Sequence, residues 1–204
     1  MNWEDVYDQN IWEDRKEAPE LIQINKLMKI KEEKILDIGC GYGRISNPLF
    51  EQGANIICID CVDEPLRIVK TKCDGKIETV KCKSDKLPLP DNMFDGIIAV
   101  NSIYHNNLKG FSDSILEMNR VLKSGGWLYC TFLSTKDYKY GLGKEIENNV
   151  FISTEGPDIG VPHVYVDEST IKSLFANWKD ISLKEDIKRF DNVESAHFVL
   201  IAKK

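Results

Sequence analysis

The sequence predicts an α/β fold in which a mostly parallel sheet is covered by helices on both faces. Short apolar runs alternate along the chain with stretches of helical period, which is typical of strands joined by crossover helices. Several of these runs are almost continuously apolar, as strands buried on both faces are. The chain has 204 residues, a length that favours one domain over two.

Five apolar runs are the expected parallel strands. The second, fourth and fifth runs are the most uniformly apolar, so each should be buried on both sides. An acidic residue lies near the end of the first run, Asp37, and another ends the second run, Asp60. The runs span residues 34–38, 55–60, 77–80, 94–100 and 126–133.

Helices are expected between these runs. The second candidate ends at Gly53, a residue that favours helix termination. The third begins with Asp63 as a cap and has Pro65 in its first turn. The expected helices span residues 19–30, 44–52, 63–73 and 112–122.

The last third of the chain has a different character. Residues 134–166 show no clean period, and so long a connection is usually functional. We expect it to be an insertion that forms a lid over the substrate. A helix is predicted over residues 167–177, followed by two strands, 181–190 and 196–202, close enough in sequence to pair antiparallel.

Charge and composition exclude several classes of protein. Lys and Arg number 27 and Asp and Glu number 33, which gives a net charge of −6. This balance argues against nucleic acid as a partner, because such binders present a basic face to phosphates. No stretch approaches the ~20 apolar residues of a membrane span, and the acidic start does not resemble a signal peptide. We therefore expect a cytoplasmic protein with no membrane partner.

The six cysteines are expected to be thiols in that compartment. Cys58 and Cys61 form a lone C-x-x-C, and a zinc site would need a second such pair. Cys73 and Cys82 are too far apart in sequence to supply it. The sequence therefore predicts no metal site.

A glycine-rich loop follows the first strand. It reads Asp37-Ile-Gly-Cys-Gly-Tyr-Gly-Arg44, with glycines that let the chain bend and a ligand approach the backbone. A dinucleotide fingerprint would need a third glycine where Arg44 stands, which disfavours a dehydrogenase. Asp60 ends the second strand, where an acid can accept hydrogen bonds from both ribose hydroxyls and repel a phosphate. The pattern points to a nucleoside ligand.

These residues resemble the class I S-adenosylmethionine-dependent methyltransferases, in particular the small-molecule group with a D-x-G-C-G-x-G loop. Two further segments are similar to that family. One is Lys86-Leu-Pro-Leu-Pro-Asp-Asn-Met-Phe-Asp95, ahead of the fourth strand, and the other is Asn119-Arg-Val-Leu-Lys-Ser-Gly-Gly126. The resemblance covers about residues 33–134 and implies a Rossmann-like, doubly wound sheet of seven strands. The implied order is 3-2-1-4-5-7-6, with the seventh strand antiparallel, all in a single methyltransferase domain over residues 1–204.

The resemblance also implies which residues hold the cofactor, S-adenosylmethionine, and its product S-adenosylhomocysteine. Asp37 would reach the methionine amino group, directly or through water, above a loop formed by Gly39, Cys40, Gly41 and Gly43. Asp60 would bind the ribose, with Cys61 beside the adenine. Either Val100 or Asn101 would offer a carbonyl to the amino group.

Two regions are less close to the family pattern. The adenine edge usually meets an acid followed by a small residue. Here that alignment gives Lys83 and Ser84, so either Asp85 substitutes or the backbone at Ser84 holds the adenine. At the N-terminus, Trp3, Tyr7 and Trp12 are similar to aromatics that form a flap over the cofactor. Residues 1–30 would then be a helical flap, although a surface helix docked on the core fits as well.

Three histidines are candidates for work on the methyl acceptor. His105 follows the fourth strand, at the lip where substrates enter such folds. His163 lies in the 134–166 insertion, and we expect it, with His105, to act as a base or substrate contact. His197 begins the last strand, which we expect to lie away from the crevice, so a structural role is favoured for it.

The predicted function is methyl transfer to an O, N or S atom of a small-molecule acceptor. An alternative is a non-catalytic module that binds S-adenosylmethionine or a nucleotide, suggested by Lys83 in the adenine-edge position. We expect a monomer or a homodimer, with no appended recognition domain.

Overall fold

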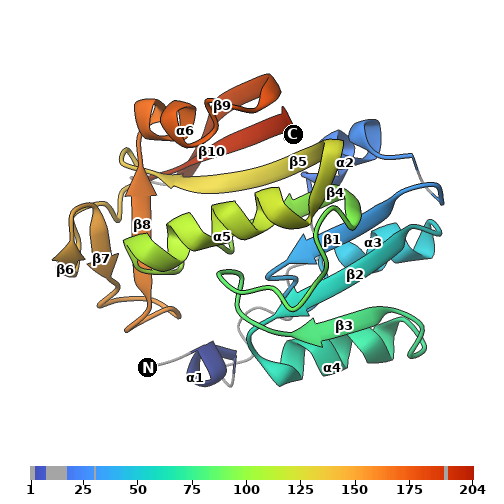
Figure 1. Cartoon of the computed structure of the whole chain (residues 1–204). Coiled ribbons are helices and arrows are strands. Elements are labelled where there is room, and N and C mark those ends of the chain that lie inside the picture. The colour runs from blue at the N-terminus through green and yellow to red at the C-terminus, as the bar shows by residue number, and fades with distance from the viewer. Residues whose placement is uncertain (1–2, 8–17, 30, 191–192) are drawn as a thin grey trace.

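The computed structural model describes residues 3–7, 18–29, 31–190 and 193–204 of the chain (Figure 1). Its helices are α1 (Trp3–Tyr7), α2 (Leu21–Leu27), α3 (Ser46–Glu51), α4 (Asp63–Lys72), α5 (Leu108–Val121) and α6 (Glu168–Leu174). Its strands are β1 (Lys34–Ile38), β2 (Asn55–Asp60), β3 (Glu78–Lys81), β4 (Phe94–Ala99), β5 (Leu122–Ser134), β6 (Lys144–Glu147), β7 (Val150–Ile152), β8 (Pro162–Val166), β9 (Lys179–Phe190) and β10 (Val193–Lys203).

The centre of the sheet is parallel, in the order β3-β2-β1-β4-β5. β10 pairs antiparallel with β5, and β9 pairs antiparallel with β10 on its outer side. If β9 and β10 are counted as the sixth and seventh predicted strands, this is the order 3-2-1-4-5-7-6. The predicted topology is therefore confirmed, including the antiparallel last strand.

The 134–166 segment adds strands that its sequence pattern did not reveal. β8 pairs in parallel with β5 at Leu133 and Ser134, beyond Cys130, where the pairing of β4 with β5 ends. β7 pairs antiparallel with β8, and β6 with β7. The segment thus prolongs the sheet past the end of β4, and in Figure 1 it projects beside α5. Short strands of mixed polarity carry too weak a period to be recognised in one sequence.

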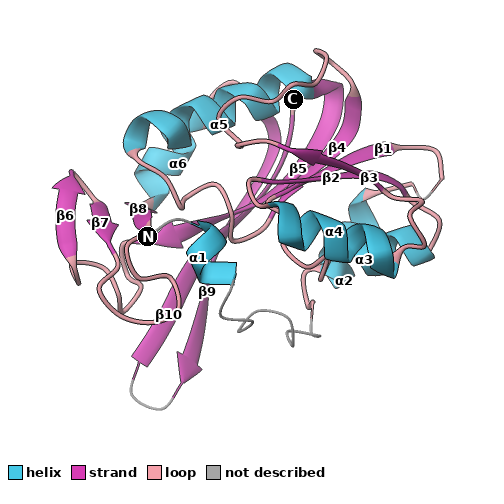
Figure 2. Ribbon diagram, turned by 90° about the horizontal axis from the view of Figure 1, so that it is seen from below, coloured by secondary structure: helices cyan, strands magenta, loops and turns pink. Residues whose placement is uncertain are grey.

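Apolar side chains of the central strands alternate between two cores, one on each face of the sheet. Leu36 packs in the core that contains Phe111 of α5, whereas its neighbour Ile35 packs in the core that contains Leu49 of α3. Figure 2 shows α5 and α6 on one side of the sheet and α2, α3 and α4 on the other. This double burial explains why the strands read as continuous apolar runs.

Two elements begin four residues earlier than predicted. α5 begins at Leu108 rather than Ser112, because the Asn107 side chain accepts a hydrogen bond from the Gly110 N–H at 2.8 Å and caps the helix. β5 begins at Leu122 rather than Gly126, because Leu122 already pairs with Phe94 of β4 before the register shifts. In both cases a local partner extends an element beyond its apolar pattern.

None of the helices in the described part of the chain is long and apolar enough to cross a membrane.

The carboxyl ends of β1, β2 and β4 lie at one edge of the sheet, which is where ligands bind in open α/β folds. This edge brings Asp37, Asp60 and Val100 into one region of the molecule.

Candidate active site

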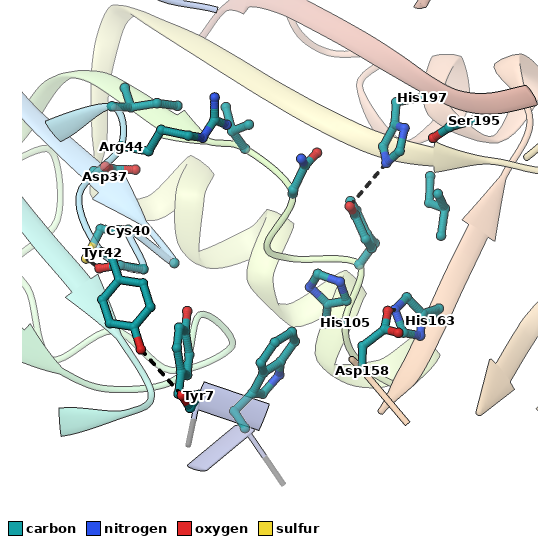
Figure 3. A pocket seen from close by; sticks show the side chains of 18 of the residues that line it. Tyr7, Asp37, Cys40, Tyr42, Arg44, His105, Asp158, His163, Ser195 and His197 are labelled. Atoms are coloured by element: carbon teal, nitrogen blue, oxygen red, sulfur yellow. Dashed lines mark hydrogen bonds and ion pairs between the residues drawn. The ribbon is translucent and has the colours of Figure 1, made fainter. Parts of the chain in front are cut away.

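A cavity of about 690 Å³ opens at the carboxyl edge of the sheet (Figure 3). One side is formed by the loop after β1, and the other by the β4–α5 connection, the 134–166 segment and β10. Its volume lies within the range of about 300–1,000 Å³ that is usual for small-molecule sites. The predicted residues that line it are Tyr7, Asp37, Gly39, Cys40, Gly41, Gly43, Val100, Asn101, His105 and His163.

The loop after β1 is held by its glycines. Gly39, Gly41 and Gly43 all have positive φ, a backbone conformation that residues other than glycine rarely adopt. A Cβ on Gly39 would stand 2.4 Å from the Ser102 Cβ, so the loop could not pack against the β4–α5 connection. The Gly39 and Cys40 N–H groups donate to Ile59 O at 2.9 and 3.0 Å, which fixes the loop to β2.

The Asp60 carboxylate organises the same loop from the end of β2. Its Oδ2 accepts from the Gly41 N–H at 3.0 Å and its Oδ1 from the Val62 N–H at 3.1 Å. Burial raises the pKa of Asp60, and these N–H donors oppose that rise. Asp60 is not part of the cavity lining, because Tyr7 lies against it and donates its hydroxyl to Oδ2 at 3.5 Å.

Asp37 has a different environment at the end of β1. Its side chain is buried, and its Oδ2 has no hydrogen-bond partner within the described residues. Burial raises the pKa of Asp37 to about 7. A buried carboxylate oxygen without a donor is costly. Since Asp37 also lines the cavity, a ligand that carries a cationic N–H donor would remove that cost.

Val100 and Asn101 form the part of the cavity that follows β4. The Asn101 backbone N–H donates to Thr131 Oγ1 at 2.8 Å, and its Oδ1 accepts from the same hydroxyl at 3.1 Å. Asn101 has a positive φ of 50°. Its side chain is therefore tied to β5.

Besides Asp60, three predicted cofactor residues lie outside the cavity lining. Cys61 follows Asp60, and burial raises the pKa of its thiol to about 12. The Ser84 and Ser114 hydroxyls lie 2.8 Å apart, so Ser84 is engaged with α5. Asp85 is half-buried beyond β3. The predicted position of the adenine edge is therefore separate from the cavity in this arrangement.

Helix α1 covers the Asp60 side of the site. The Tyr7 ring packs edge-on against Tyr42 at 5.3 Å between centroids, and the Tyr42 hydroxyl donates to Tyr7 O at 3.5 Å. Trp3, one turn earlier, lies edge-on to His105 at 4.7 Å and also lines the cavity. Trp12, predicted with them, lies outside the described residues.

The opposite side of the cavity contains His105 and His163. His105 Nδ1 lies 3.1 Å from Ser102 O, so this nitrogen carries the hydrogen and Nε2 is left for a ligand. Burial holds the pKa of His105 well below its usual value, so the ring is neutral at pH 7. The two imidazole rings lie edge to face, 4.8 Å apart.

Asp158 joins these histidines, and no motif pointed to it. Its Oδ2 is 2.8 Å from His163 Nε2, while His163 Nδ1 donates to Val161 O at 2.9 Å. Burial opposes ionisation of Asp158, but His163 and Lys139 outweigh it and hold the pKa of Asp158 well below its usual range. It lies in an irregular stretch between β7 and β8, where sequence period gives no signal.

The expectation that His197 lies away from the crevice was wrong. β10 runs along β5 as far as Leu133, and this pairing brings His197 into the cavity lining. The Tyr104 hydroxyl and His197 Nε2 lie 3.2 Å apart (Figure 3). Sequence reasoning placed the last hairpin away from the crevice because it could not show how far β5 extends.

The chain is similar in sequence to known proteins over about half of its length. Residues 36–130 match a family model described as a methyltransferase domain. A mitochondrial ubiquinone biosynthesis O-methyltransferase of Rattus norvegicus is 34% identical over 119 residues, 54% of this chain and 33% of that protein. The chain therefore spans about a third of the length of that relative, as it does of several others from mammals.

Solved structures of similar fold cover nearly the whole chain. A protein of Methanosarcina mazei described as an S-adenosylmethionine-dependent methyltransferase has a TM-score of 0.75 at 24% identity. The match covers 93% of this chain and 98% of that one. A Burkholderia thailandensis 1,6-didemethyltoxoflavin-N1-methyltransferase, with bound 1,6-didemethyltoxoflavin and S-adenosylhomocysteine, has a TM-score of 0.70 at 14% identity. That match covers 99% of this chain and 84% of that one.

Proposed function

We propose that the chain is a class I S-adenosylmethionine-dependent methyltransferase that methylates a small-molecule acceptor. The match of residues 36–130 to a methyltransferase-domain model supports this, as do the methyltransferases that the chain resembles in sequence and in fold. The acceptor would bind on the histidine side of the cavity, and the methyl donor on the glycine-loop side. The relative from Rattus norvegicus is named for O-methylation in ubiquinone biosynthesis, which supports a small molecule rather than a macromolecule as acceptor.

The observation that carries this proposal is the unpartnered Oδ2 of buried Asp37 at the glycine loop. The cofactor's ammonium group is a cationic donor of the kind this oxygen lacks. Gly39, Cys40, Gly41 and Gly43 would lie under the methionine part, and Val100 or Asn101 would offer a carbonyl. Asp60 would take the ribose and Cys61 the adenine side, with Ser84 or Asp85 at the adenine edge.

Helix α1 is proposed as part of a flap over the cofactor, as residues 1–30 were expected to form. Tyr7 already donates to Asp60 Oδ2, so a ribose hydroxyl and the Tyr7 hydroxyl would share that oxygen. The aromatic faces of Trp3 and Tyr7 would also attract a sulfonium ion, by about 0.5–2 kcal/mol.

When bound, S-adenosylmethionine supplies an electrophilic methyl group and a thioether leaving group. The chain's own residues then have to align the acceptor atom and remove its proton, where it carries one. His105 suits the second task, because its ring is neutral and its Nε2 can accept a proton. His163 suits it less, because both of its nitrogens face acceptors, so we assign it to holding Asp158 and the acceptor in place.

The test is calorimetric titration of the full chain with S-adenosylmethionine and S-adenosylhomocysteine. We expect one equivalent of each to bind. Asp37→Asn should weaken S-adenosylmethionine binding, because the amide places an N–H donor where the ammonium group needs an acceptor. No heat and no thermal shift with either compound would overturn the proposal, and binding of a nicotinamide dinucleotide instead would favour a dehydrogenase.

A further inference from the structure

We propose that His105, Asp158 and His163 form a binding site for a divalent transition-metal ion, with Zn²⁺ the ion that best fits its ligands. One potential ligand atom from each of the three side chains lies within 4.8 Å of the other two. Atoms that share a zinc ion at 2.0–2.1 Å are about 3.3 Å apart in tetrahedral geometry. The widest pair therefore needs to close by roughly 1.5 Å at most, and the His163–Asp158 pair, at 2.8 Å, needs to open by about 0.5 Å.

The His163–Asp158 contact needs a positive centre. An imidazole nitrogen and a carboxylate oxygen stand 2.8 Å apart, and each is an acceptor unless a proton or a metal ion lies between them. The other nitrogen of His163 is already committed as a donor to Val161 O. A proton satisfies His163 and Asp158 alone, whereas a metal ion also binds the nearby His105.

Each of the three side chains is oriented by a second contact, as metal ligands usually are. His105 and His163 both direct Nδ1 at a backbone carbonyl, of Ser102 and Val161 respectively, which leaves Nε2 as the ligand nitrogen. Asp158 keeps Oδ1 near Lys139 Nζ at 3.5 Å and Ser153 Oγ at 3.4 Å, while Oδ2 faces His163. The orientation of all three is therefore set before an ion arrives.

The ligand types select the metal. Two imidazole nitrogens and one carboxylate suit Zn²⁺ and similar ions such as Co²⁺, and not Mg²⁺ or Ca²⁺, which prefer oxygen ligands. Three protein ligands also leave one coordination position open, as in catalytic zinc sites. All three residues line the cavity, so the open position can be reached by a small molecule (Figure 3).

The role of the ion in methyl transfer rests on the proposed function, although the existence of the site does not. An ion there would bind the acceptor through a lone pair and hold it opposite the glycine loop. Its charge would also lower the pKa of an O–H or N–H group on the acceptor, so that the proton could be lost to solvent without His105 as the base. Acceptors with an oxygen, nitrogen or sulfur lone pair that binds metals are then favoured.

The experiment is a titration of the chelator-treated full chain with Co²⁺, followed by visible absorption, with Zn²⁺ added afterwards as competitor. We expect one equivalent of Co²⁺ to give d–d bands, which Zn²⁺ abolishes. His105 is the least buried of the three residues, so His105→Gln is the change that disturbs the fold least. His105→Gln and Asp158→Asn should each weaken Co²⁺ binding at least tenfold. His197→Gln is the matched control, since this third cavity histidine lies outside the cluster and should leave Co²⁺ binding unchanged.

Three results would overturn the proposal. One is a folded wild-type protein that binds no Co²⁺ in the micromolar range. Another is one-equivalent binding that survives the double change His105→Gln and His163→Gln, which would place the ion elsewhere, for example on the cysteines. The third is equal loss of binding in His197→Gln. S-adenosylmethionine binding by the metal-free protein is measured in parallel, so failure of the proposed function is seen separately.

Discussion

Asp37 and Asp60 end neighbouring strands, yet their carboxylates have different surroundings. Asp60 accepts two backbone N–H groups from its own loop and the glycine loop, whereas Asp37 Oδ2 has no donor within the described residues. Burial raises the pKa of both, and for Asp37 to about 7. One carboxylate thus shapes the loop, and the other is left for a ligand.

Replacement of Asp60 should weaken cofactor binding strongly. In Asp60→Ala the Gly41 and Val62 N–H groups lose their acceptor, and the ribose loses its partner. A hydrogen bond to a charged group is worth about 1.5–3 kcal/mol, so we expect a roughly 10- to 100-fold loss of S-adenosylmethionine affinity by calorimetry. Asp63→Ala is the control, because Asp63 is exposed and contacts Lys81 instead. Unchanged affinity in Asp60→Ala would remove Asp60 from the site.

His197 should make the protein less stable in acid. Burial lowers its pKa in the folded state, while in the unfolded chain it titrates near 6.5. Below about pH 6.5 the unfolded chain therefore binds a proton that the folded chain resists, so the free energy of unfolding falls. The fall continues until the pH passes the folded pKa, with a slope of at most about 1.4 kcal/mol per pH unit.

The measurement is urea unfolding at pH 7.5 and pH 5.5 for the wild type and His197→Gln. His105 acts in the same direction, since burial also lowers its pKa, so the wild type should lose stability over this interval. The variant should lose less. If the two proteins show the same pH dependence, His197 does not titrate as its burial indicates.

At the scale of elements, Arg120 of α5 connects the helix to the segment that precedes β4. Its guanidinium donates to Leu87 O at 2.9 Å and Leu89 O at 2.8 Å, and it pairs with Glu117 and Asp91. This segment has no regular structure, so Arg120 provides hydrogen bonds that a strand would otherwise supply. The family-like sequence around residues 86–95 and 119–126 is thus one structural unit.

Arg120→Ala should destabilise the fold by about 2–4 kcal/mol, because two backbone carbonyls and the Glu117 carboxylate lose their donor. Chemical denaturation at neutral pH measures the change. Arg189→Ala serves as the comparison. Arg189 forms an exposed ion pair with Glu194, and such a pair is worth less than about 1 kcal/mol. Equal effects of the two changes would show that Arg120 is not structural.

At the scale of the whole molecule, one cavity joins parts of the chain that lie far apart in sequence. The loop after β1, the β4–α5 connection, the 134–166 segment and β10 all line it. A ligand that binds there stabilises the folded state by mass action, about 2.7 kcal/mol at a hundred times its dissociation constant. Ligand binding in the cavity thus increases the free energy of unfolding of the whole domain.

Binding of the cofactor should therefore raise the midpoint temperature of thermal unfolding. For a chain of this size, 1 kcal/mol moves the midpoint by about 2–4 °C, so saturating S-adenosylmethionine should raise it by roughly 5–11 °C. A nicotinamide dinucleotide at the same concentration should leave it unchanged, because Arg44 stands where that fingerprint needs glycine. A rise with the dinucleotide alone would contradict the assigned ligand class.

The sequence by itself determined the central sheet and the glycine-loop side of the cavity. Apolar runs, helix caps and the glycine loop are local patterns, and local sterics fix what they form. Gly39 has a positive φ, which glycine adopts most easily. The sequence also indicates where Asp37 and Asp60 lie, because each stands at or near the end of an apolar strand. Tertiary structure alone decided the histidine side of the cavity. Asp158 and His197 enter the cavity because β8 and β10 pair with β5, and no local pattern encodes contacts between residues so distant in the chain.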